Sequence, residues 1–219
     1  MTFPTPVAAV SRAWRRLRRA LALIAGAALT LPVAAAQLAP SNLTRLIGES
    51  DVIVSGRVKS VTDGVDAQGV PFTEVTIAVA ASAKRKLTPN KDFKFRQYGL
   101  LSSRKMADGR FLVAKAPEGF PTWHKEEQVV AFMNRPASKT GLRTTIGLSQ
   151  GKFVSTGGRM ANEQFNRGLF AGVEVSQGYL TPAESALLRS PAGAVDAATL
   201  MSLVNRAAAG KWIEKGVMR

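Results

Sequence analysis

Few residues of this chain could carry out acid–base or nucleophilic chemistry. The 219 residues include no cysteine and a single histidine, His124. A metal site built on two histidines, a cysteine-bound zinc and a thiolate nucleophile are therefore excluded within one chain, and a Ser-His-Asp triad would have to use His124. His124 stands just before two carboxylates, Glu126 and Glu127. A hydrolase that uses His124 as general base with Glu126 or Glu127 is one hypothesis that follows.

The alternative interpretation of His124 is an exposed loop histidine beside a charged turn. On a strand, the adjacent side chains of Glu126 and Glu127 would point to opposite faces and would not act as a carboxylate pair. The sequence contains no G-x-S-x-G, P-loop, H-E-x-x-H or G-x-G-x-x-G motif. We therefore expect no catalytic residue, no metal site and no cofactor, and we expect that the protein is not an enzyme.

Basic residues are the second distinctive feature. The formal net charge is +15 and the sequence pI is about 10.9. Residues 84–115 contain ten basic and two acidic residues. If this block forms a strand with flanking loops, its cations converge on one edge of the fold and attract anions. The residues expected to contact an anionic partner are Lys84, Arg85, Lys86, Lys94 and Arg96. A solvated face that keeps the protein soluble is the alternative interpretation.

The N-terminal segment has the pattern of a secretory signal peptide. Residues 1–20 contain five arginines and no acid, and residues 21–31 form a short apolar run. Pro32 follows, and three alanines precede Gln37. This order predicts a signal peptide over residues 1–36 that is cleaved before Gln37, and hence a periplasmic or secreted product. An uncleaved membrane anchor is the alternative, but the apolar run is short for a membrane span.

The remaining pattern predicts a mainly β fold. A short helix is expected over residues 41–48, and alternation of apolar and polar residues then indicates strands. Gly56 predicts a bulge or bend in the first strand. The expected strands cover residues 51–62, 71–82, 91–98, 110–115, 127–133, 144–148 and 152–155. The last two form either a tight hairpin or one strand broken by a bulge. The first two read as a long antiparallel hairpin, and the pattern from 157 to 178 is irregular.

Two helices are predicted near the C-terminus. Thr181-Pro182-Ala183-Glu184 has the form of a capping box with proline at the first helical position, and the helix should end near Arg189. A second helix is expected over residues 196–209, with Gly210 as its stop. The fold class expected is therefore a small OB-like β-barrel, residues 37–156, with a short N-terminal helix. Residues 157–219 would form an irregular and helical region packed on the barrel.

Part of the chain resembles a known group of proteins. The stretches SDVIVSGRVKSV, AVAASAKRK and EEQVVAFM, with the later GLSQGKF, are similar to a group of secreted bacterial proteins of uncharacterised function. Their core resembles the netrin/TIMP-like OB barrel. The resemblance covers roughly residues 50–155 and implies the barrel. Netrin and TIMP domains carry a cysteine framework that this chain lacks, so the resemblance does not imply protease inhibition.

Export, charge and the lack of catalytic motifs together predict a non-enzymatic binding or accessory module. Its basic face would recognise another exported protein or an anionic polymer or lipid of the cell envelope. Nucleic acid is not an expected partner. Phe93 and Phe95 alternate with Lys94 and Arg96 along the strand, so the aromatic rings lie opposite the cations. The alternative is an envelope hydrolase that uses the single histidine.

Overall fold

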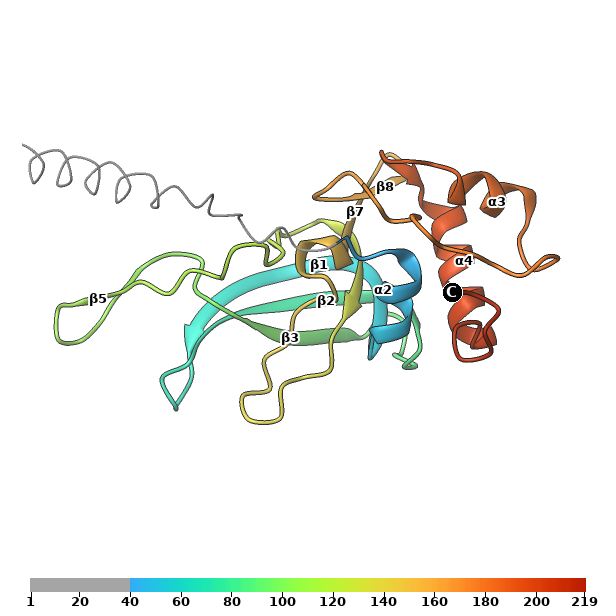
Figure 1. Ribbon diagram of the computed structural model, residues 1–219. Helices are drawn as coiled ribbons and strands as arrows, with labels where there is room; N and C mark the ends of the chain where they lie inside the picture. Colours follow the sequence, from blue (N-terminus) through green and yellow to red (C-terminus); the bar gives the residue numbers. More distant parts are fainter. Residues whose placement is uncertain (1–39) are drawn as a thin grey trace, which may run out of the picture. The chain divides into compact units, whose positions relative to one another are not determined.

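The computed structural model describes residues 40–219, and the predicted signal peptide, residues 1–36, lies outside the described residues. A seven-stranded antiparallel sheet forms the frame, in the order β3-β2-β1-β6-β7-β8-β9 (Figure 1). The predicted mainly β class is confirmed. The strands of this sheet are β1 (Val52–Val65), β2 (Pro71–Ala83), β3 (Asp92–Tyr98), β6 (Gln128–Met133), β7 (Lys152–Thr156), β8 (Arg159–Asn162) and β9 (Val195–Asp196).

Smaller elements accompany the sheet. A separate two-stranded ribbon pairs β4 (Arg104–Lys105) with β5 (Phe111–Leu112). The helices within residues 40–219 are α2 (Leu43–Glu49), the 3-10 helix η1 (Leu148–Gly151), α3 (Pro182–Leu188) and α4 (Ala197–Gly210). Side-chain caps fix where the α-helices begin. Asn42 caps α2, Asp196 caps α4, and Thr181 and Glu184 form the predicted capping box of α3.

The long hairpin of β1 and β2 follows the alternation of its sequence. Val52, Val54 and Val58 of β1 share one apolar cluster with Val75 and Ile77 of β2. The register shifts at two places along β1, one of them between Ser55 and Gly56. A Cβ at Gly56 would stand 2.0 Å from the carbonyl oxygen of Ala78, so this bulge requires glycine. The predicted hairpin and the bend at Gly56 are confirmed.

Each face of the sheet has its own core. One face packs against α2 and α4, where Phe132 and Phe153 meet Leu43, Leu203 and Val204. The other face buries the valines of β1 and β2 under Phe95 and Trp123, whose rings meet edge to face with centroids 5.2 Å apart. The sheet is therefore buried on both sides at its centre, and its middle strands are correspondingly apolar.

The OB-like barrel is not confirmed, because no closed barrel is detected in residues 40–219. The sheet has two edges, β3 and β9. Residues 144–148 were expected to form a strand, either in a tight hairpin with residues 152–155 or as one strand with them that is broken by a bulge. Instead Thr145 makes an isolated bridge with Met133, and the chain then enters η1. The N–H of Arg143 does donate a hydrogen bond to the carbonyl of Arg96 in β3, at 2.8 Å.

The chain after residue 156 continues the same sheet. Residues 157–158 form the turn between β7 and β8, so the expected domain boundary falls inside a hairpin. The region predicted to be irregular thus contains a strand, β8, which pairs with β7 on one side and with β9 on the other. All described residues belong to one compact unit.

Candidate functional site

Lys84 and Lys86 lie in the loop that follows β2. Lys84 has a left-handed backbone, with φ of 64°, and its ammonium group donates hydrogen bonds of 2.7 Å to the carbonyls of Ile47 and Gly48. These are carbonyls of the last turn of α2, where a cation is favoured. Lys86 is exposed and has no polar partner within residues 40–219. Lys84 therefore caps a helix, whereas Lys86 is free to meet a partner.

Arg85 belongs to a group of charges that we call the Asp51 cluster: Asp51, Arg85, Arg135 and Arg143. Asp51 lies just before β1, and its N–H bonds to the carbonyl of Met133 at 2.9 Å, which sets it beside the end of β6. Its carboxylate stands 2.9 Å from Arg85, 3.2 Å from Arg143 and 4.0 Å from Arg135. Three guanidinium groups thus surround one carboxylate, which can neutralise only one of them.

Arg143 is the buried member of the Asp51 cluster. Its side chain is 6% exposed, lies over the ring of Phe93 and donates a hydrogen bond to the carbonyl of Asn134, while its Nε has no partner within the described chain. Burial lowers the pKa of Arg143, the charge of Asp51 opposes this, and repulsion from Arg85 adds to the lowering. Two guanidinium groups of like charge, those of Arg143 and Arg85, are therefore held close together beside Asp51.

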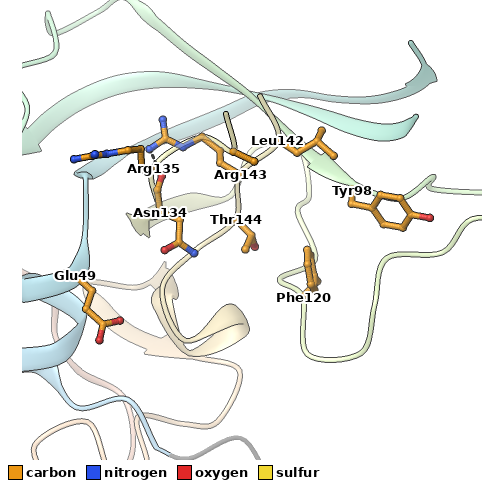
Figure 2. A pocket seen from close by; sticks show the side chains of 9 residues that line it. Glu49, Tyr98, Phe120, Asn134, Arg135, Leu142, Arg143 and Thr144 are labelled. Carbon is orange, nitrogen blue, oxygen red and sulfur yellow. Dashed lines mark hydrogen bonds between the residues drawn. The ribbon is translucent and has the colours of Figure 1, made fainter. Parts of the chain in front are cut away.

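A cavity of about 410 Å³ lies beside the cluster (Figure 2). Arg135 and Arg143 form part of its wall, together with the polar side chains of Asn134 and Thr144. An apolar part of the wall is provided by Tyr98, Phe120, Ala137 and Leu142, and Glu49 completes the lining. Figure 2 shows the two arginines and the aromatic rings on different sides of the space. The cavity could hold a ligand that has an apolar group against the apolar wall and a negatively charged group next to it, near the two arginines.

The other two predicted residues lie elsewhere. Lys94 and Arg96 are on β3, where Lys94 pairs in register with Thr76 and Arg96 with Glu74. Arg96 forms an ion pair of 2.8 Å with Glu74 and stacks over the ring of Phe72. The two basic side chains of β3 project from the face opposite to that of Phe93, over whose ring Arg143 lies. The five predicted residues therefore do not form one patch, and their role in binding stays a prediction.

Sequence reasoning did not identify two arginines of the Asp51 cluster as site residues. Arg135 and Arg143 lie outside the basic block 84–115, and Arg143 is 92 residues from its partner Asp51. The spacing of charges within one segment carries no sign of such a contact. The sequence signal that does exist is compositional, since the segment 134–143 has three basic residues, Arg135, Lys139 and Arg143, and no acidic residue.

His124, the basis of the hydrolase hypothesis, is an exposed residue. Its side chain is 69% exposed, and its Nδ1 lies 2.9 Å from Glu127. Glu126 instead pairs with Arg57. The cavity of Figure 2 is lined by other residues. The structure thus joins His124 to Glu127 and separates it from Glu126.

Glu127 is bound on two sides. Besides His124, it accepts a hydrogen bond of 2.5 Å from the buried ammonium group of Lys152, which also lies 5.0 Å from the centroid of the Trp123 ring. Burial raises the pKa of Glu127, but the hydrogen bonds from Lys152 and His124 outweigh it and hold the pKa below its ordinary value. A carboxylate held ionised by a buried lysine is a poor general acid and serves to fix this loop.

Comparison with protein-family models, with curated proteins and with solved structures finds no match. The resemblance to secreted OB-like proteins therefore stays a prediction. No helix within residues 40–219 has the length and apolar character needed to cross a bilayer. Within the same residues, no three histidine or acidic side chains gather as metal ligands would.

Proposed function

We propose that the protein is an exported, non-enzymatic binding module that recognises an acidic segment of another exported protein through the Asp51 cluster. Export rests on the signal-peptide pattern of residues 1–36. The binding role rests on one observation, the three arginines that converge on a single carboxylate. Such an excess of guanidinium groups provides donors for further carboxylates.

Arg135 is the cation best placed to engage a partner. Its side chain is 87% exposed and stands at 4.0 Å from Asp51, at the limit of an ion pair. Because an exposed pair of this length contributes little, Arg135 loses little when it turns to another carboxylate. Arg85 is half exposed and shares the same aspartate oxygen. These two guanidiniums can therefore meet acidic groups at the surface, while the buried Arg143 holds Asp51 in place.

The cavity beside the cluster supports a protein as partner over a carbohydrate or polyphosphate chain. Tyr98, Phe120 and Leu142 give part of its wall an apolar surface. An apolar side chain gains free energy by leaving water for such a surface, about 25 cal/mol per Å² buried. Polypeptides combine apolar side chains and carboxylates at neighbouring positions, whereas an anionic glycan offers the charge without the apolar group.

Fluorescence anisotropy with labelled peptides tests this proposal. The probes are a peptide of alternating glutamate and leucine, a poly-glutamate of equal charge, and heparin fragments. We expect the mixed peptide to bind most tightly and Arg135→Glu to weaken it at least tenfold, because one charge-assisted contact contributes about 1.5–3 kcal/mol. Lys139→Glu is the matched control, since it makes the same charge change at an exposed position in the same loop.

The outcomes separate the candidate partners. A loss with Arg135→Glu and a change below about twofold with Lys139→Glu supports the cluster as the binding site. Equal losses with both variants would show that the net charge alone attracts the peptide and would contradict the proposal. Tighter binding of heparin than of either peptide would contradict a protein partner and favour an anionic envelope polymer.

A further inference from the structure

The β4–β5 ribbon and the segments that lead to it form an arm, residues 100–115. The surface of this arm is rich in exposed apolar side chains. Every residue from 101 to 110 is exposed, and Figure 1 shows the ribbon extending away from the main sheet. Within residues 40–219, seven large apolar side chains are exposed, and four of them lie on this arm. These four are Leu101, Met106, Phe111 and Val113. So dense a group of exposed apolar side chains indicates an interaction surface.

Lysines lie beside the apolar side chains Phe111 and Val113 of the arm. Lys105 pairs in register with Phe111, and paired residues of a ribbon project to the same side. Val113 lies just beyond β5 and lines a hollow together with Lys115. Lys105 and Lys115 have no acidic partner in the described part of the chain, whereas Arg104 and Arg110 pair with aspartates. The arm thus combines free cations with apolar groups.

The arm is fixed firmly at its base. The carboxylate of Asp63, in β1, accepts hydrogen bonds of 2.8 Å from the N–H of Leu101 and from Arg104. Burial raises the pKa of Asp63, but these hydrogen bonds and the charge of Arg104 outweigh it and lower the pKa below its ordinary value. The N–H of Leu100 donates to the carbonyl of Ala114 at 2.7 Å. The two legs are therefore held together, although a hollow of about 200 Å³ lined by Leu101, Val113 and Lys115 remains between them.

We propose that this arm binds the surface of an anionic lipid bilayer. Apolar side chains beside lysines match the boundary between acyl chains and negatively charged headgroups. The depth of insertion follows from the backbone. A two-stranded ribbon has two open edges whose N–H and C=O groups must stay hydrated, so the arm can enter only the headgroup region. Phe111 and Val113 would reach the acyl boundary, and Lys105 and Lys115 would contact phosphates.

The inference uses other residues than the proposed function and goes beyond it. Asp63, which holds the arm, lies near the C-terminal end of β1, whereas Asp51 lies just before its start. Both surfaces can therefore be occupied in the same molecule. A protein that binds a bilayer with one end and an acidic partner with the other would bring that partner to the membrane surface.

Vesicle binding by the chain that follows residue 36 tests the inference. The probes are vesicles of phosphatidylcholine alone and vesicles with about 30 mol % phosphatidylglycerol, which carries the negative charge. Co-sedimentation should show binding to the anionic vesicles and at least tenfold weaker binding of the double variant Phe111→Ser, Val113→Ser. The matched control is Phe165→Ser, because Phe165 is 71% exposed against 65% for Phe111 and lies outside the arm. A second variant, Phe111→Trp, reports insertion directly through quenching by brominated lipid.

Each outcome decides the inference. Loss of binding with the double variant, unchanged binding with Phe165→Ser and quenching of Phe111→Trp would support it. Unchanged binding of the double variant, or absence of quenching while the protein sediments with vesicles, would overturn it. Arg135→Glu should leave vesicle binding within about twofold, since that residue lies outside the arm. If Arg135→Glu abolished vesicle binding, the membrane contact would belong to the Asp51 cluster and the arm would not be the contact.

Discussion

Replacing Asp51 by alanine would leave the buried guanidinium of Arg143 without its carboxylate. Water cannot take the place of that carboxylate readily, because the Arg143 side chain is almost fully buried. Removal of one partner from a buried ion pair costs about 3–5 kcal/mol. The carbonyl of Asn134 and the ring of Phe93 still hold the guanidinium, so we expect the lower end, about 3 kcal/mol. The exposed pairs with Arg85 and Arg135 add little.

Thermal and guanidinium unfolding followed by circular dichroism would measure this loss. For a domain of this size, about 3 kcal/mol corresponds to a fall in Tm of roughly 6–12 °C. Glu74→Ala is the matched control. It breaks the pair with Arg96, which is half exposed, and should cost less than about 1 kcal/mol.

A double-mutant cycle isolates the pair itself. Arg143→Met removes the buried charge, so the double variant with Asp51→Ala should be more stable than Asp51→Ala alone by about 1–3 kcal/mol. A loss below about 1 kcal/mol for Asp51→Ala, or an absence of coupling between the two positions, would refute the assignment of Arg143 as a buried charge that depends on Asp51.

Two further predictions concern the frame of the fold. Gly56→Ala should destabilise the protein by about 3 kcal/mol in chemical unfolding, because the new Cβ meets the carbonyl of Ala78. A change near zero would show that the bulge has room for a Cβ and would contradict this prediction. Burial raises the pKa of Glu184, but hydrogen bonds from Thr181 and Arg206 outweigh it and lower the pKa below its ordinary 4.5. A lowered pKa adds stability at neutral pH that is lost as pH falls below about 4.5. Glu184→Gln should therefore reduce the urea midpoint at pH 7 and flatten its decline toward pH 3, and an unchanged acid slope would argue against this role.

Local patterns predicted much of the frame. Alternation of apolar and polar residues predicted the β1–β2 hairpin, because a shift of one residue would turn its valines toward the opposite face. The capping box at Thr181 and Glu184 was readable because its atoms lie within one turn. Gly210 marked the end of α4 for a different reason than expected. It lies within the helix, the ring of Trp212 occupies the space of a Cβ there, and Lys211 takes the left-handed cap position.

Contacts between distant segments were beyond sequence reasoning. Residues 144–148 have the apolar alternation of a strand, yet Gly147 adopts a left-handed conformation and η1 begins at Leu148, so the expected strand does not form. Charge composition located the basic block but not the positions of its side chains. Lys84 caps a helix and Arg96 pairs across a strand, whereas Arg143 reaches Asp51 from 92 residues away. Pairing of this kind depends on tertiary packing, which no local spacing encodes.

Chemical-shift mapping tests the central claim most directly. Titration of the isotope-labelled protein with the glutamate–leucine peptide would show which amide and arginine side-chain signals move. The proposed function predicts that the largest changes fall at Arg85, at Arg135 and in the loop 134–145 that lines the cavity, with His124 and Glu127 unmoved. Shifts spread evenly over all basic surfaces, or centred on His124, would contradict it.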